Sequence, residues 1–509
     1  MKLSSYPHLA LSATGGVLYA LGHVGFGAWP LLWFSLAPLW RGQDPRWGHS
    51  LSYSAGCGFI FGACAYVLGY SWLWSLVEVF LEGNRWLAVG LWIANGAWFA
   101  IGFAIHTWLL AILGRRGWSL TGSAVASLIV VQWLQPQLFA AELGTGLIHA
   151  PLLAQTAEWG GPLLLTAWVA AINGVLVSIW SWKRQERGRP DRGILAVLTM
   201  STIALLFGGF RMGSWTPPSS STPIRVGIVQ ANLSPSADAA ERIRAHRRYL
   251  ELSRTLTAQT KLDLIVWPES AYGPAVRLPL PVAGQTIRGD LTTPLLFGGT
   301  SLVHDEHGEH RGNSVFLVET DGMIRSMYRK NLLIPFAEFL PFEDVVPSLR
   351  EWFPHAQRFS PPDRSEALKL NHWRIVTPIC YEVVHASYVR HLIRRDRPHL
   401  LVTLANDAWF GDSQEPWIHL NLTRLRAIEN RRWVVRATNS GISAVIDPLG
   451  RVVTRSELFA PDTLQAIVYP RSQLTIYARL GDWPGWLAGI AIVLGLMLRR
   501  QTHKSTEQR

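Results

Sequence analysis

Long apolar segments separated by short polar ones occupy the first 212 residues of the chain. Seven of them precede residue 213, and an eighth lies near the C-terminus: roughly 8–22, 26–40, 51–80, 86–113, 119–141, 160–182, 193–211 and 483–498. A helix needs about 20 apolar residues to cross a bilayer, so the first two segments are short enough to form a tight or tilted pair. The pattern predicts a membrane α-helical bundle of about eight spans, with seven in residues 1–212.

The pattern changes after residue 212. The segment 213–223 is rich in serine, threonine and proline and is predicted to be a linker. From 224 to 472, short strand-like runs are interspersed with helix-period segments, notably 239–256 and 417–431, which predicts a layered α/β domain. The strand-like runs are 224–230, 264–267, 295–299, 314–319, 374–379, 400–404, 433–438 and 442–446. Residues 473–509 then hold the C-terminal span and a tail.

Charge and aromatic content support a membrane protein. The formal net charge of +12 could suggest nucleic-acid binding, but no basic stripe with interleaved aromatic residues and no zinc-ligand spacing is found. The 25 tryptophans are typical of the aromatic belts at bilayer surfaces. We therefore expect a bilayer as partner, no nucleic acid, no metal and no cofactor.

The basic residues between the apolar segments predict the orientation in the membrane. With the N-terminus inside, the outside short loops hold little more than Arg85. The inside loops then hold Lys2, Arg41, Arg46, Arg115, Arg116, Lys183, Arg184, Arg187, Arg189, Arg192, Arg499 and Arg500. Because positive residues concentrate on the cytoplasmic side, both termini are predicted to lie inside and the 224–472 domain outside the cytoplasm.

Cys380 is the candidate nucleophile. Cys57 and Cys64 lie in an apolar segment, and three cysteines give neither a disulfide framework nor a metal-ligand pattern. Cys380 follows a strand-like run at 372–376 and precedes a helical segment at 385–395. Backbone N–H groups at such a turn point at the group under attack, and the helix N-terminus is expected to favour a thiolate. The alternative is a buried, inert thiol.

Glu269 and Lys330 are candidate partners for this thiol. A cysteine nucleophile needs a base and a group that stabilises the oxyanion. Each residue follows a strand-like run, at 264–267 and 323–328 respectively. Taken singly, Glu269 could be a loop carboxylate and Lys330 a surface lysine. Three such residues at strand ends in one α/β domain are more consistent with a catalytic triad.

These residues and their neighbours resemble the nitrilase (carbon–nitrogen hydrolase) superfamily, whose members use a Glu-Lys-Cys triad on an αββα sandwich. The flanks Pro268, Arg329, Tyr381 and Glu382 are similar too. With its apolar segments, the whole chain resembles the membrane-embedded branch, the apolipoprotein N-acyltransferase family. That likeness rests on the segments 335–338, 406–413, 424–429 and 438–441. The chain departs from the family pattern around 238–239, at Ala337 and over 133–149.

The resemblance implies roles for the site residues. Glu269 would act as general base and acid, and Lys330 would stabilise the thiolate and the oxyanion. The Tyr381 N–H would complete the oxyanion hole, while Glu338 would support Lys330. Glu382 resembles a second essential acid, although a carboxylate near a helix N-terminus is also ordinary.

Two aromatic groups are candidates for substrate contact. Phe336 and Phe339 lie in the apolar loop 332–342, and Trp409 and Phe410 adjoin each other. They could form an apolar approach to Cys380, or they could simply fill the core. The irregular segment 343–365 has the length typical of lids.

The resemblance implies a multi-pass enzyme of the bacterial inner membrane. It would move an acyl chain from a phospholipid, through a Cys380 thioester, to the α-amino group of the diacylglyceryl-cysteine of an apolipoprotein. Two alternatives remain open: a membrane-tethered amidase that hydrolyses a small amide, and a non-catalytic scaffold with the same fold. The residues do not indicate a head-group preference or an oligomeric state.

Overall fold

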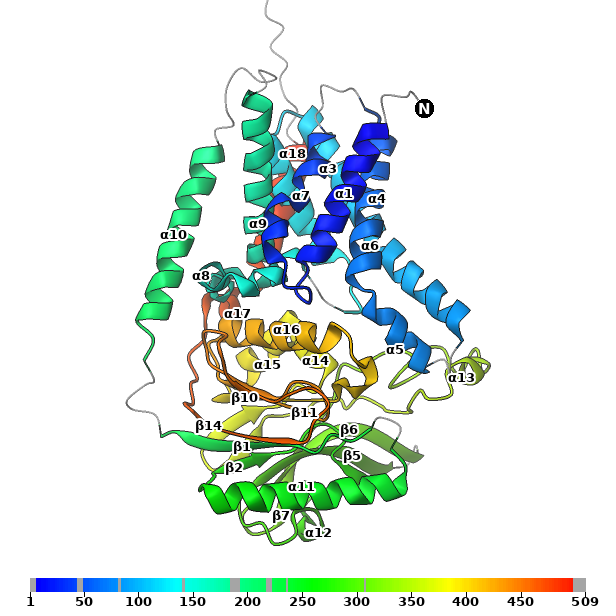
Figure 1. The fold of residues 1–509 in the computed structure, drawn as a ribbon, viewed down its shortest axis with the longest axis vertical. Coiled ribbons are helices and arrows are strands. Elements are labelled where there is room, and N and C mark those ends of the chain that lie inside the picture. Colours follow the sequence, from blue (N-terminus) through cyan, green and yellow to red (C-terminus); the bar gives the residue numbers. More distant parts are fainter. Residues whose placement is uncertain are drawn as a thin grey trace, which may run out of the picture.

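The computed structural model has a helical bundle at one end and a two-sheet domain at the other (Figure 1). It describes residues 6–43, 49–80, 84–139, 142–183, 193–216, 222–234, 237–305 and 308–497. Part of the predicted linker, 217–221, and the tail from 498 onward lie outside the described residues. So do these basic residues of the predicted inside loops: Lys2, Arg46, Arg184, Arg187, Arg189, Arg192, Arg499 and Arg500.

The bundle holds the predicted apolar segments as helices of unequal length. Among the described residues, four helices are long and apolar enough to cross a membrane: α4 (Leu51–Gly69), α6 (Arg85–Arg115), α9 (Ala157–Lys183) and α10 (Gly193–Gly213). Three others are shorter, namely α1 (Tyr6–Gly22), α7 (Leu120–Leu134) and α18 (Trp483–Met497). The membrane-type bundle is therefore present, while length and composition support fewer spans than the sequence pattern predicts.

Two predicted segments are interrupted. The segment 26–40 forms the short pieces η2 (Trp29–Leu31), α2 (Leu32–Ser35) and α3 (Ala37–Arg41). The segment 51–80 bends between α4 and α5 (Trp72–Phe80), and α5 runs out toward the two-sheet domain (Figure 1). α5 therefore brings apolar side chains beside that domain.

Two sheets form the second part. In the first, strands follow the order β14-β1-β2-β5-β6-β7-β4, with β3 also paired to β5, and in the second β13-β12-β11-β10-β9-β8. The first sheet comprises β1 (Ile224–Gln230), β2 (Leu264–Val266), β3 (Tyr272–Arg277), β4 (Val282–Ala283), β5 (Leu295–Asp305), β6 (Gly308–Val318), β7 (Met323–Arg329) and β14 (Asp462–Val468). The second comprises β8 (Leu368–Leu370), β9 (Trp373–Val376), β10 (Leu400–Ala405), β11 (Val434–Thr438), β12 (Ala444–Ile446) and β13 (Val452–Arg455).

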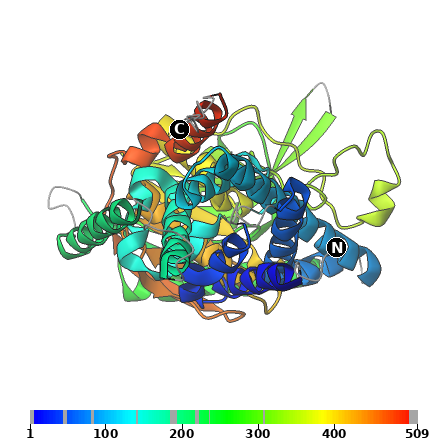
Figure 2. The same cartoon turned by 90° about the horizontal axis from the view of Figure 1, so that it is seen from above.

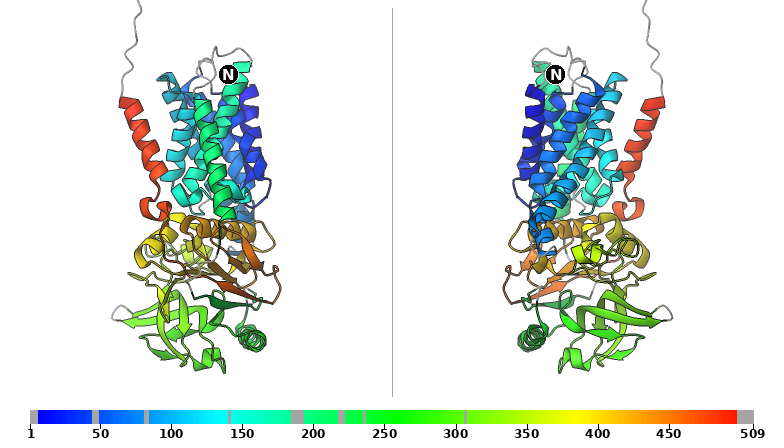
Figure 3. Two further views of the ribbon diagram at one scale, coloured as in Figure 1. Left: turned by 90° about the vertical axis from the view of Figure 1, so that its left-hand side faces the viewer. Right: turned by 90° about the vertical axis from the view of Figure 1, so that its right-hand side faces the viewer.

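The sheets pack face to face with helices outside, an αββα sandwich (Figures 1 and 3). α11 (Ala239–Gln259) covers the first sheet, and α14 (Tyr381–Val384), α15 (Ala386–Asp396) and α16 (Glu415–Asn430) cover the second. β10 and β11 are buried at every residue because both faces of their sheet are covered, which is why they read as continuous apolar runs. This arrangement fits the layered α/β domain predicted from the sequence.

The layer α14–α16 lies between the second sheet and the bundle (Figure 3). One apolar core joins the two parts, since Tyr381, Phe410 and Leu422 pack in the same buried cluster as the bundle helices. Hydrogen bonds also cross the junction, from Asn421 Nδ2 to the Val24 carbonyl at 3.1 Å and from Gln155 Nε2 to the Leu449 carbonyl at 3.1 Å. The bundle thus forms one wall beside the edge of the sandwich.

Candidate active site

Cys380 lies in a tight turn after β9. It precedes the first residue of α14 and has a positive φ of 48°, which is uncommon for a residue other than glycine. Its N–H donates to the Leu404 carbonyl at 2.7 Å, and Thr403 Oγ1 donates to the Pro378 carbonyl at 2.9 Å. β10 therefore holds the turn from one side. The predicted strand-to-helix position of the thiol is present, although α14 has only four residues.

Glu269 follows β2 and is nearly buried, with 7% of its surface exposed. Its Oε1 accepts a hydrogen bond from Asn313 Nδ2 at 2.6 Å, and Lys330 Nζ lies 3.9 Å from the same oxygen. Its Oε2 has no hydrogen-bond partner within the described part of the chain. One oxygen is thus held in place while the other is available to take a proton.

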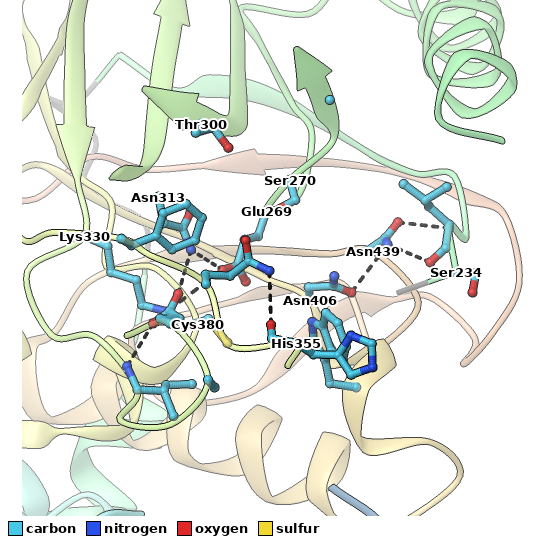
Figure 4. Close-up of a pocket in the computed structure, with 18 of the residues that line it drawn as sticks. Ser234, Glu269, Ser270, Thr300, Asn313, Lys330, His355, Cys380, Asn406 and Asn439 are labelled. Atoms are coloured by element: carbon cyan, nitrogen blue, oxygen red, sulfur yellow. Dashed lines mark hydrogen bonds and ion pairs between the residues drawn. The ribbon is translucent and has the colours of Figure 1, made fainter. Parts of the chain in front are cut away.

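Lys330 follows β7 and is 1% exposed. Its ammonium donates to Glu338 Oε1 at 2.8 Å, and its backbone N–H donates to the Asn313 carbonyl at 2.8 Å. Glu338 is fixed in turn, because its Oε1 accepts from Asn313 Nδ2 at 3.0 Å and its Oε2 from the Ile334 N–H at 2.9 Å. Figure 4 shows Glu269, Asn313, Lys330 and Cys380 together at one end of the pocket.

These charges set the resting protonation states. Burial and the negative charge of Glu269 raise the pKa of the Cys380 thiol well above its usual value, although Lys330 acts in the opposite direction. Burial also raises the pKa of Glu269, with Glu338 adding to the effect. Burial disfavours the Lys330 ammonium, but the charges of Glu338, Glu269 and Cys380 outweigh it and raise the pKa of Lys330.

The resting site therefore holds a protonated thiol beside a cationic lysine. The predicted thiolate is not favoured in this state, because burial and the nearby carboxylates raise the pKa of the thiol. The Glu269 carboxylate lines the same pocket as this thiol.

Glu382 is fully buried and does not line the pocket. Its Oε2 accepts from Tyr328 Oη at 2.9 Å and from the Ile379 N–H at 2.8 Å, and its Oε1 from the N–H groups of Asn331 at 2.7 Å and Leu332 at 3.1 Å. The carboxylate therefore ties the residue before Cys380 to the two residues after Lys330. This geometry is that of a positioning residue.

The backbone N–H and the side-chain ring of Tyr381 have different surroundings. As the first residue of α14, it has no intrahelical acceptor for its N–H, which leaves that donor beside the thiol. Its ring packs edge-on against His385 at 4.5 Å and Phe139 at 5.8 Å between centroids. Burial raises the pKa of its phenol to about 12, so the side chain stays neutral.

The triad residues line a pocket of about 220 Å³ between the sandwich and α5. Trp409 and Phe410, on η5 (Asp407–Phe410), line it together with Leu76 of α5. Phe336 does not reach this pocket and packs against Phe353 at 5.1 Å, and Phe339 lines a neighbouring cavity instead. Two of the four predicted substrate-contact aromatics are therefore at the pocket wall.

Asn313 was not anticipated from the sequence, although it bridges both glutamates. An asparagine near the middle of a strand carries no local signal, and only the register of β6 against β7 places it opposite the residues around Lys330. No local sequence motif therefore marks Asn313 as a site residue.

His419 was also missed. Its Nε2 lies 3.2 Å from the Cys380 carbonyl oxygen and its Nδ1 lies 2.9 Å from Asp407 Oδ1. Asp407, Glu415 and His419 are close enough to suggest a cation site. However, the Arg436 guanidinium contacts Asp407 Oδ2 at 2.6 Å and supplies the positive charge there. The cluster supports the Cys380 turn through the contact of His419 with the Cys380 carbonyl.

Two family models match the two parts of this chain. The family model for the apolipoprotein N-acyltransferase N-terminal domain matches residues 15–175, and the carbon-nitrogen hydrolase model matches residues 225–473. The chain is similar to Nit3 of Saccharomyces cerevisiae, a nitrilase-superfamily structure, at 18% identity and a TM-score of 0.40, covering 50% of this chain and 94% of that one.

Relatives align with the chain from end to end. A protein of Pseudomonas putida named apolipoprotein N-acyltransferase is 30% identical, covering 96% of this chain and 95% of its own. A protein of the same name from Azotobacter vinelandii is 30% identical over 536 residues, covering 98% of this chain and 96% of its own. Since both parts of the fold align with such relatives, the chain belongs to the apolipoprotein N-acyltransferase family.

Proposed function

We propose that this protein transfers an acyl chain from a phospholipid to the α-amino group of the N-terminal diacylglyceryl-cysteine of an apolipoprotein. The observation that carries the proposal is the buried Cys380 thiol beside Glu269 and Lys330 in a pocket whose wall includes Leu76 of α5. A site that faces apolar helices suits an acyl donor, and family membership supports the same reaction.

In the first half-reaction, Glu269 takes the thiol proton as the Cys380 sulfur attacks the carbonyl carbon of the donor ester. The carbonyl oxygen of the ester becomes an oxyanion, which the Lys330 ammonium and the Tyr381 N–H stabilise. When the C–O bond breaks, Glu269 returns the proton to the departing alkoxide of the lysophospholipid. The acyl chain then remains on Cys380 as a thioester.

In the second half-reaction, the amine nitrogen of the acceptor attacks the thioester carbonyl. Glu269 takes a proton from that nitrogen and the same two donors stabilise the oxyanion. The C–S bond breaks, and the thiolate regains its proton from Glu269. Water competes with the amine, so the apolar wall at Trp409 and Phe410 protects the thioester.

The eight-span topology belongs to the same proposal, with both termini in the cytoplasm and residues 224–472 outside it. The first described residues of α1 lie at the end of the bundle away from the sandwich, which fits this orientation (Figure 1). Alkaline phosphatase fused after Gly213 should be active, whereas a fusion at the C-terminus should be inactive. The reverse pattern would contradict the orientation.

Acyl-enzyme formation is the direct test. Purified protein is incubated with acyl-labelled phospholipid, and the adduct is located by peptide mass. We expect a hydroxylamine-sensitive acyl group on Cys380 that is absent from Cys380→Ala and retained in Cys57→Ala and Cys64→Ala. On adding a diacylglyceryl-cysteine peptide, the label should move to its amine.

The other functions give different results in this assay. Loss of the label to water alone, with no transfer to the peptide, would favour an amidase. No adduct, together with a Cys380→Ala variant that behaves as wild type, would leave a non-catalytic scaffold.

A further inference from the structure

A second cavity, of about 460 Å³, lies where α10 meets the two-sheet domain. It shares no lining residue with the catalytic pocket. α10 and α8 (Pro151–Ala154) stand at one side of the molecule and α5 at the other (Figures 1 and 2). The cavity is therefore separate from the site of acyl transfer.

The cavity lies at the end of a helix that is long and apolar enough to cross a membrane. Arg211 is in the last turn of α10, a helix apolar and long enough to cross the membrane, and Trp215 follows two residues after the helix ends at Gly213. Trp159 and Phe207 pack together on its wall at 4.2 Å between ring centroids. Tryptophan rings at the end of an apolar helix are typical of the head-group region.

The charges in this cavity do not balance. Arg211, Arg431 and Arg471 line it, against the single carboxylate of Glu158. Arg211 Nη2 donates to Glu158 Oε1 at 2.7 Å, and Arg431 Nε donates to Glu158 Oε2, so one carboxylate is shared by two guanidinium groups. A surplus of positive charge remains.

Arg471 is the one of these three guanidinium groups that forms no ion pair with Glu158 within the described part of the chain. Among the described residues its side chain donates one long hydrogen bond, to Gln473 Oε1 at 3.5 Å. Its guanidinium lies over the Trp215 ring at 4.8 Å from the centroid. Burial lowers the pKa of Arg471 and the charge of Arg211 lowers it further, whereas the Glu158 carboxylate raises it, so negative charge nearby favours the guanidinium.

We propose that this cavity binds a phosphate oxyanion, supplied by the head group of an anionic phospholipid, between Arg211 and Arg471. Guanidinium groups match phosphate oxygens with paired N–H donors, and the aromatic wall suits the glycerol and upper acyl region. Free inorganic phosphate has the same chemistry and is the other source. A lipid bound here would hold α10 and the start of the sandwich at the bilayer surface.

The test measures binding in full-length protein that carries Cys380→Ala, so that its result does not depend on acyl transfer. The probe is a phosphatidylglycerol with ether-linked chains, which has no acyl ester to donate. Arg471→Gln and Arg211→Gln each remove one guanidinium, and Arg479→Gln removes an exposed arginine of the same region that lies outside the cavity. Native mass spectrometry counts bound lipids, and thermal unfolding confirms that each variant is folded.

We expect Arg471→Gln and Arg211→Gln to weaken the binding of one lipid by about tenfold, which is typical of losing a charge-assisted hydrogen bond. Arg479→Gln should bind as the parent protein does. If millimolar inorganic phosphate displaces that lipid, free phosphate also occupies the site; if it does not, the lipid is the ligand. Unchanged lipid and phosphate binding in both folded variants, or an equal loss in Arg479→Gln, would overturn the proposal.

Discussion

Replacing Glu382 by glutamine tests whether this residue positions the site or takes part in the chemistry. The buried carboxylate accepts hydrogen bonds from Tyr328 Oη and from the N–H groups of Ile379, Asn331 and Leu332. A glutamine side chain keeps the shape but turns one acceptor oxygen into an NH₂ donor. Two of the four N–H and O–H groups would then face the new NH₂ group instead of an acceptor oxygen.

The size of the effect follows from those bonds. A hydrogen bond to a charged group contributes about 1.5–3 kcal/mol, and a buried donor without a partner costs about 1–3 kcal/mol. Losing two such bonds gives about 3–6 kcal/mol. A neutral amide is easier to bury than the carboxylate, whose pKa burial raises, so we expect a net loss near the lower end, about 3 kcal/mol.

Two measurements on the same purified variant check this expectation. In detergent, about 3 kcal/mol should lower the Tm of a domain of this size by roughly 6–12 °C. The rate of acyl-Cys380 formation should fall as well, because Glu382 links the turn before the thiol to the loop after Lys330. Glu366→Gln is the matched control, since that glutamate is exposed, and it should change neither quantity.

A Glu382→Gln variant that keeps the wild-type Tm but loses activity, with an altered pH profile of acyl-Cys380 formation, would refute the reasoning. Glu382 would then act as an acid in the reaction. A variant with wild-type Tm and wild-type rate would mean that the four hydrogen bonds do not hold the site.

Three further changes affect Glu269. Glu338→Gln removes a negative charge that raises the pKa of Glu269, so the acidic limb of the pH dependence of acyl-Cys380 formation should move to lower pH; a shift to higher pH would contradict this. Asn313→Ala removes a hydrogen bond that lowers the same pKa, so in that variant the limb should move to higher pH. Gly298→Ala places a Cβ 2.6 Å from the Glu269 Cα and should slow acyl-enzyme formation, whereas Gly299→Ala, with its nearest contact at 3.4 Å, should not; equal rates in the two variants would exclude backbone crowding as the cause.

The strand positions of the second sheet were predictable because burial on both faces gives uninterrupted apolar runs. The runs at 400–404 and 433–438 correspond to β10 and β11. β13, by contrast, alternates between exposed and half-buried residues, and β4 has only two residues, so neither stands out from a loop. The local hydrophobic pattern indicates which residues are buried, and the residues of these edge strands are little buried.

The three predicted triad residues follow the ends of β2, β7 and β9, strands that belong to both sheets and meet at one pocket. Their supporting groups could not be found in the same way. Asn313 meets Glu269 only through the pairing of β5 with β6, and His419 meets the Cys380 carbonyl only because α16 packs over α14. Such contacts depend on register and helix packing, which a single sequence does not specify.

The bundle and the sandwich act as one body at the catalytic pocket. Trp72 of α5 packs edge-on against Phe410 at 5.6 Å, and both belong to the apolar core that joins the two parts. The bundle therefore adds Leu76 of α5 to a pocket wall that the sandwich otherwise forms, with Trp409 and Phe410 among its residues. Under the proposed function, the contact of α5 with Phe410 adds to the apolar surface that keeps water from the acyl group, which favours transfer to an amine over hydrolysis.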